Sequence, residues 1–151
     1  MNPVYTHEEV IDKFQALLEN WDFNTELKRL GISAIHIIRR KQMLLELKGL
    51  FVGLWRLALT RSFPEDGQQI FEGYMERCVS KPKNAGKGQE LVERSHKYVE
   101  MLAMHGDTDF SEVSRYLTSF LKLPESARKS ATLKLALEIR KMYNIIFERL
   151  I

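Results

Sequence analysis

The only thiol in the sequence is the first candidate for covalent chemistry. Cys78 is the single cysteine among the 151 residues, so the chain cannot form an internal disulfide. A cysteine becomes a nucleophile when a neighbouring base or cation stabilises its thiolate. No histidine stands at local spacing from Cys78, which shares an apolar helix face with Ile70, Phe71 and Tyr74. This position favours a buried structural thiol over a catalytic one.

Three potential metal ligands lie on one predicted helix face. Glu93, His96 and Glu100 follow one another at spacings of three and four residues. The Glu-x-x-His unit resembles one half of the site in di-iron bundle proteins, which implies a second such unit elsewhere in the chain. None of the other three histidines has a glutamate three residues before it. We interpret the three residues as a solvated helix face, and we expect no metal and no other cofactor.

The run 80–88 is the clearest loop in the sequence. It ends in Asn-Ala-Gly86-Lys87-Gly88, which resembles the end of a phosphate-binding P-loop. Lys81 stands where that motif has its leading glycine, and Gly88 where it has serine or threonine. No strand precedes the run to preorganise its backbone N–H groups. We therefore predict a flexible basic loop without a phosphate site.

Residues 24–41 carry a candidate nucleic-acid surface. This segment has a short helical pattern, then Gly31, then a second helical pattern, with Ile32 and Ile37 as candidate core contacts. The arrangement resembles a helix-turn-helix, whose second helix enters the major groove. The resemblance implies a set of polar residues that could contact bases and phosphates. These are Ser33, His36, Arg39, Arg40 and Lys41.

Two departures separate this segment from that motif. Leu27 stands where a small residue would let the two helices cross closely, and the second helix does not stop but continues into the apolar segment 43–59. The other interpretation is a helical corner whose cations pair with the N-terminal helix. Residues 1–26 hold one lysine against six acids, whereas 27–63 hold eight lysines and arginines against Glu46 alone. We favour the corner and keep DNA binding as the alternative.

The segment 43–59 is apolar almost all round a helix, so neighbouring helices or a second chain must cover it. Gly49 and Gly53 form a narrow strip along which another helix can approach closely. Phe51 and Trp55 beside the strip would be strong anchors if the contact joined two chains. These four residues are our candidates for a helix–helix or dimer contact, and we favour an internal helix partner.

A membrane span is not expected at this segment. Glu46, Lys48 and Arg56 interrupt it, and the charge-free stretch 49–55 is far shorter than the roughly 20 residues that a spanning helix needs. The N-terminus lacks the basic and apolar regions of a secretory signal. With one cysteine in the chain, we expect a cytoplasmic protein with no membrane partner.

Helical spacing of apolar residues, with capping signals such as Thr6 and Glu9, predicts helices throughout the chain. The predicted helices cover about 7–20, 24–30, 33–63, 65–79, 89–105, 109–123 and 125–151. No segment shows the sustained alternation of a strand. We predict an all-α, single-domain bundle over residues 1–151, with about six or seven helices around a long, largely apolar central helix at about 33–63.

Function follows mainly from what these patterns lack. No nucleophile–base pair, paired ligand set or phosphate loop is apparent, whereas apolar helix surface is abundant. We therefore expect a non-enzymatic protein that acts through protein–protein contacts, either with a partner or by self-association as a homodimer. The alternative is a DNA-binding regulator that uses residues 24–41.

Overall fold

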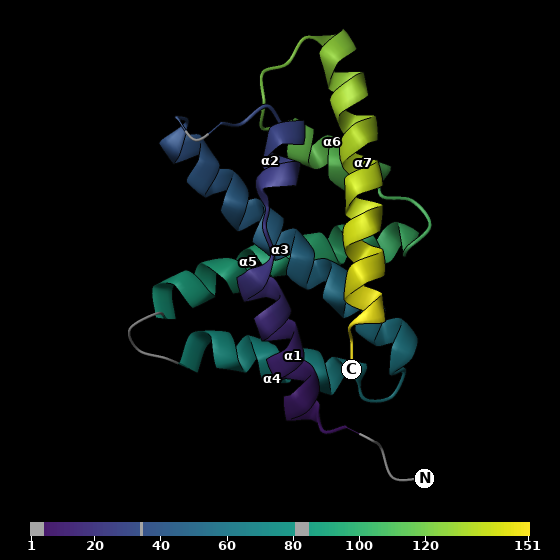
Figure 1. The fold of residues 1–151 in the computed structure, drawn as a ribbon. Coiled ribbons are helices and arrows are strands. Elements are labelled where there is room, and N and C mark those ends of the chain that lie inside the picture. Colours follow the sequence, from purple (N-terminus) through teal and green to yellow (C-terminus); the bar gives the residue numbers. More distant parts are fainter. Residues whose placement is uncertain (1–4, 34, 81–84) are drawn as a thin grey trace.

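The computed structural model describes residues 5–33, 35–80 and 85–151, and in these ranges the chain forms helices and connecting turns without strands. Figure 1 shows their arrangement. The helices are α1 (His7–Asn20), α2 (Asn24–Arg29), α3 (Ile37–Ser62), α4 (Gly67–Ser80), α5 (Ala85–His105), α6 (Ser111–Thr118) and α7 (Glu125–Glu148). The prediction of an all-α bundle is confirmed.

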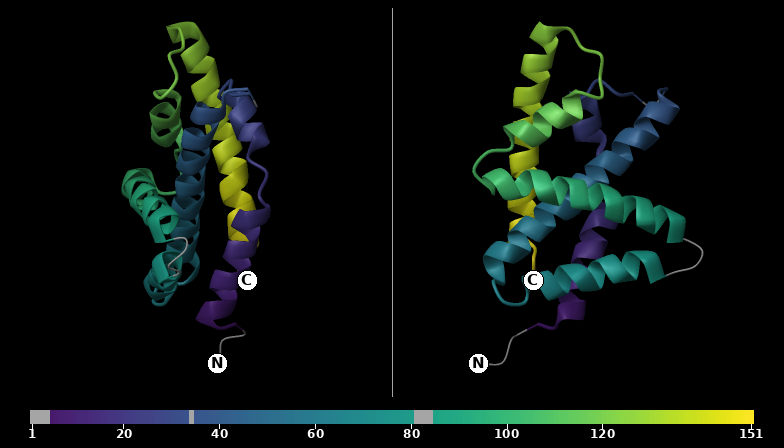
Figure 2. Two further views of the ribbon diagram at one scale, coloured as in Figure 1. Left: turned by 90° about the vertical axis from the view of Figure 1, so that its left-hand side faces the viewer. Right: turned by 180° about the vertical axis from the view of Figure 1, so that it is seen from behind.

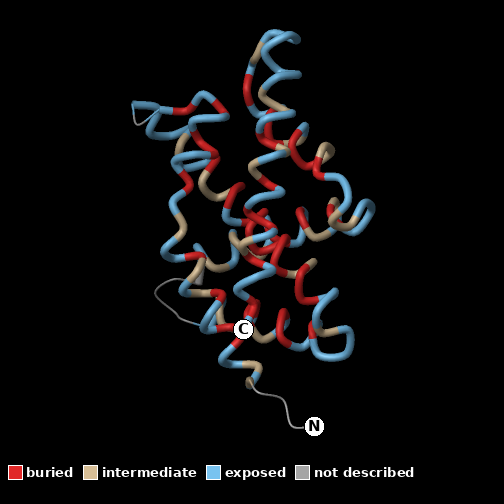
Figure 3. Tube along the Cα trace, turned by 45° about the vertical axis from the view of Figure 1, so that its right-hand side comes forward, coloured by how far each residue is buried: buried red, intermediate tan, exposed pale blue. Residues whose placement is uncertain are grey.

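The central helix α3 lies between two layers of helices. Seen edge-on, α1, α2 and α7 lie on one side of it, and α4, α5 and α6 on the other (Figure 2). Every residue of α3 from Gly49 to Trp55 is buried, as the apolar pattern predicts. Buried positions, red in Figure 3, gather where the helices cross, whereas residues 125–130 at the start of α7 are all exposed. No helix among the described residues is both long enough and apolar enough to cross a membrane.

The start of α3 differs from the prediction. The helix begins at Ile37 and not at Ser33, and it ends at Ser62. Gly31, with φ of 73°, ends the preceding helix in the left-handed region that favours glycine. The Ser33 carbonyl then accepts from the His36 N–H at 3.1 Å, and the Ser33 N–H donates to His36 Nδ1 at 3.3 Å. Because this turn already uses the polar groups of Ser33, the residue does not cap the long helix.

Other helix boundaries were predicted with mixed success. The Thr6 hydroxyl accepts from the Glu9 N–H at 3.1 Å, so the predicted cap of α1 is confirmed. The predicted loop is wrong at Gly86–Gly88, because these residues belong to the first turn of α5, while residues 81–84 lie outside the described ranges. A Cβ at Gly88 would collide with the Cys78 carbonyl, so the absence of a side chain lets α5 begin directly against α4.

The Gly49 and Gly53 strip of α3 lets α5 pack against it very closely. An alanine Cβ at Gly49 would lie 2.8 Å from Arg94 Cβ and 3.1 Å from the Arg94 carbonyl carbon, and one at Gly53 would lie 3.0 Å from Tyr98 Cβ. Glu46, one turn earlier, is only 3% exposed. Its carboxylate lies 3.2 Å from Arg94 Nε and accepts from the Tyr98 hydroxyl at 3.3 Å. The close approach therefore also places a cation and a donor on a buried carboxylate.

The aromatic side chains next to the strip pack against α1, in the layer opposite α5. Phe51 and Trp55 are 0% and 1% exposed. The Phe14 ring of α1 stacks on Trp55 with centroids 4.0 Å apart, and it lies 5.6 Å from the Phe51 ring. Gly49, Phe51, Gly53 and Trp55 are thus all in the interior of one chain. The internal contact with α5 accounts for the Gly49 and Gly53 strip within one chain.

We predict that Gly49→Ala destabilises the fold even though alanine is the better helix former. Replacing an interior helical glycine with alanine ordinarily gains about 1 kcal/mol. Overpacking a tight contact costs about 1–3 kcal/mol, and here the added methyl meets backbone atoms that cannot rotate away. We expect a net loss of about 1 kcal/mol in the free energy of unfolding, measured by urea denaturation.

Gly86→Ala is the matched control, because nothing lies within 4 Å of a Cβ at that helical position. This variant should be as stable as the original chain or slightly more stable. A Gly49→Ala variant that matched Gly86→Ala would show that the close approach of α3 and α5 is not a packing constraint.

Candidate functional site

An open groove of about 940 Å³ lies between the end of α1, the first half of α3, the end of α4 and the start of α5. In Figure 1, α3 and α5 diverge from their crossing toward the left of the view. Half-buried apolar side chains line the groove, contributed by separate parts of the chain. They include Trp21, Leu44, Leu45, Cys78 and Leu91.

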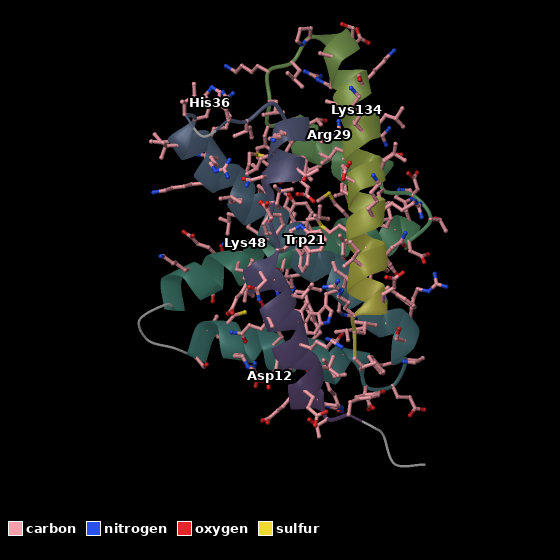
Figure 4. The ribbon with its side chains drawn as sticks, viewed as in Figure 1. Asp12, Trp21, Arg29, His36, Lys48 and Lys134 are labelled. Atoms are coloured by element: carbon pink, nitrogen blue, oxygen red, sulfur yellow. The ribbon has the colours of Figure 1, made fainter. Side chains whose placement is uncertain are left out.

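Charged side chains border this apolar lining. Lys41 and Lys48 of α3 and Lys87 of α5 are exposed lining residues. None of these three lysines forms an ion pair within the described part of the chain. The acidic lining residues are Glu19, Asp22 and Glu90. Lys48 and Trp21, both labelled in Figure 4, are among the lining residues.

Two arginines that line the groove are already engaged. The Arg77 guanidinium lies 2.6 Å from Asp12 Oδ1 and donates to Gln15 Oε1 at 3.0 Å, so it joins α4 to α1. Arg40 donates to the side-chain oxygen of Asn24 and joins α3 to α2. These contacts fix the helices on either side of the opening. The lysines therefore supply the positive charge that is free to meet a ligand.

The thiol in the groove is poorly suited to nucleophilic chemistry. Burial raises the pKa of Cys78 above its ordinary value, while a hydrogen bond with Tyr74 and the charge of Arg77 act in the opposite direction. Burial also raises the pKa of the Tyr74 hydroxyl. Both groups are therefore protonated at neutral pH. The geometry agrees with the interpretation of Cys78 as a structural thiol.

The structure separates the residues of the candidate nucleic-acid surface. The Ser33 hydroxyl lies 3.2 Å from His36 Nδ1, so these two side chains contact each other. Arg40 is half-buried and bonded to Asn24, whereas Arg39 and Lys41 are exposed. Only these last two cations of the set remain free to contact a partner.

The geometry around them does not match a helix-turn-helix. Residues 30–36 connect α2 to α3, a longer connection than the three- or four-residue turn of that motif. Ile32 is buried as predicted, but Ile37 is 64% exposed, so its assignment to the core was wrong. The α3 helix starts beyond the body of the fold, where no neighbour covers this side chain. DNA binding through residues 24–41 stays a prediction.

The favoured corner interpretation also needs correction. The described cations of residues 27–41 make no ion pair with α1. Arg29 instead lies 3.6 Å from Glu138 of α7, because α2 packs against α7. In the described part of the chain, the acidic segment 1–26 and the basic segment 27–63 therefore do not pair with each other along their length. Some cations of the basic segment stay exposed to solvent.

The predicted solvated face on α5 is present. Glu93, His96 and Glu100 are exposed, and the His96 ring packs edge-on near Phe71 with centroids 6.4 Å apart. Among the residues that the structure describes, no group of three or more His, Cys, Asp or Glu side chains could hold a metal ion.

The groove itself was missed in the sequence because four separate segments build it. The available signal is on α3, where Lys41, Leu44, Leu45 and Lys48 recur at spacings of three and four residues. That pattern marks a mixed face on a helix that is otherwise apolar. Comparisons with protein-family models, curated proteins and solved structures found no match.

We predict slow alkylation of Cys78 by iodoacetamide in the folded protein. The raised pKa leaves less thiolate at neutral pH than an ordinary cysteine has, so the rate should still be rising above pH 9.0, the usual midpoint. Mass spectrometry of the alkylated fraction against pH measures this profile. The same chain in concentrated guanidinium chloride is the control and should return to the ordinary midpoint. Fast alkylation of the folded chain at neutral pH would instead indicate an activated thiol.

Proposed function

We propose that the chain is a non-enzymatic binding module that receives an amphipathic helix of a partner protein in the groove. The observation that carries this proposal is the half-buried apolar lining beside three lysines that form no ion pair among the described residues. Amphipathic helices commonly bind in such grooves by placing apolar residues on the floor. A binding role also suits a groove whose only thiol is held protonated.

The α3 part of the lining favours a helix that is acidic beside its apolar stripe, since the acidic lining residues Glu19, Asp22 and Glu90 come from other segments. Leu44 and Leu45 lie between Lys41 and Lys48 along α3, and Leu91 faces the opening from α5. A ligand with leucines three and four positions apart could contact these apolar side chains. Glutamates next to that stripe would then meet the lysines, and charge complementarity would select them over basic helices.

A pair of model peptides tests the groove. One is a helix with leucines on one face and glutamates beside them, and the other replaces each glutamate with lysine. We expect the acidic peptide to bind at least about tenfold more tightly at low salt, and to lose affinity as salt screens the lysines. Trp21 lines the groove while Trp55 is buried in the core, so a change in tryptophan fluorescence reports occupancy.

Matched variants identify the surface. Lys48→Glu with Lys87→Glu should weaken the acidic peptide by about tenfold or more, whereas Lys134→Glu on the exposed face of α7 should not. Trp21→Phe should remove the fluorescence change while calorimetry still detects binding. Equal affinity for the two peptides, or an equal loss in the Lys134→Glu variant, would contradict a charge-selective groove.

The solution mass decides between a partner protein and self-association. Sedimentation should give a monomer at the concentrations used for peptide binding. A dimer that the Lys48→Glu, Lys87→Glu variant dissociates would make a second copy of the chain the occupant of the groove, and would contradict the proposal of a separate partner.

A further inference from the structure

Three isoleucines at and just before the start of α3 are exposed in the described part of the chain. Ile35 is 83% exposed, Ile37 64% and Ile38 75%. His36, between them, is labelled at the upper left end of the ribbon in Figure 4, where α3 begins beyond the body of the fold. Clustered apolar side chains of this size at a protruding end indicate a contact surface. We call residues 35–41 the α3 tip.

The tip is also basic. Residues 35–41 contain Arg39, Arg40 and Lys41 and no acidic residue. Arg39 directly follows Ile38, and Lys41 lies three residues after it. Both are exposed, and no described ion pair engages them. The α3 tip thus combines apolar side chains that can insert into an apolar phase with cations that can bind negative charge.

We propose that the α3 tip binds the surface of a membrane that contains anionic lipids. The isoleucines would enter the boundary between headgroups and acyl chains, while Arg39 and Lys41 contact lipid phosphates. This combination is the one that peripheral membrane proteins use, because neither attraction alone gives firm binding. The tip is a surface contact, and it departs from the expectation of no membrane partner, which considered only spanning segments and secretion signals.

The other candidate occupants would satisfy either the isoleucines or the cations of the tip, but not both. A second copy placed symmetrically on it would bring two tips with three cations each together. A nucleic acid would pair with the cations but leave Ile37 and Ile38 without an apolar partner, since phosphate contacts are polar. An anionic bilayer meets both the isoleucines and the cations. Its two contributions can be measured separately.

Vesicle co-sedimentation of the full chain tests the proposal. The chain should sediment with vesicles of phosphatidylcholine and phosphatidylserine, and much less with phosphatidylcholine alone. Each cation near an anionic surface contributes about fivefold to binding, so Arg39→Ser should weaken it by about that factor. Ile37→Ser with Ile38→Ser should weaken it by about tenfold or more, because the insertion is lost.

Leu133→Ser with Leu137→Ser is the matched control, since these α7 leucines are 65% and 55% exposed but lie outside the tip. This variant should bind like the original chain. Thermal unfolding checks that all variants fold, which their exposed positions favour. The groove variant Lys48→Glu, Lys87→Glu keeps the tip intact and should still bind vesicles, which separates this proposal from the previous one.

Three outcomes would overturn the membrane contact. The first is equal sedimentation with both vesicle types, and the second is serine substitution of the isoleucines without effect on binding. The third is binding to duplex DNA or to an acidic protein that the Ile37→Ser, Ile38→Ser variant retains, with no binding to vesicles. That last result would assign the cations of the tip to another anionic partner.

Discussion

The approach of α5 to α3 at Gly49 and Gly53 is the constraint on which the rest of the molecule depends. Without side chains at these positions, α5 lies close enough for Arg94 and Tyr98 to reach the buried carboxylate of Glu46. A buried carboxylate without partners would strongly destabilise the fold. The close contact of α3 and α5 therefore does two things: it packs the helices, and it gives the Glu46 carboxylate its two partners. The apolar stretch beyond it can then be covered on both sides, by α5 and by the aromatic cluster around Phe14.

The crossing also explains the location of the candidate surfaces. Two straight helices that meet closely at one point must separate away from it, and here they separate toward the start of each helix. The space between them becomes the groove, with Leu44 and Leu91 on its two sides. Beyond the groove, α3 continues past its neighbours, which leaves Ile37 and Ile38 in solvent. A single tight contact thus produces a buried segment, a groove and an uncovered tip along one helix.

Local signals in the sequence predicted those features whose cause is local. The cap at Thr6, the glycine stop at Gly31 and the apolar segment 43–59 each depend on a few neighbouring residues, and each is present in the structure. Ser33 was predicted to start the long helix because serine is a common N-cap residue. In the structure its polar groups bond with His36 instead, and the helix begins at Ile37. Ile37 looked like a core residue because apolar type does not reveal how far a helix extends beyond its neighbours. The groove needs residues from four segments, so no single pattern could reveal it.

The position of Arg40 and Lys41 has a thermodynamic consequence. Both residues line the groove, and both belong to the tip. Along a rigid helix of 26 residues, about 39 Å long, they are the part that the two surfaces share. Arg40 is held by Asn24, so Lys41 is the shared cation that remains free. A ligand in the groove that engages Lys41 changes the charge presented at the tip, and a bound surface at the tip changes the charge offered to the groove. Reciprocity requires that each occupant alter the affinity of the other by the same factor, so the charge of Lys41 couples the two surfaces directly.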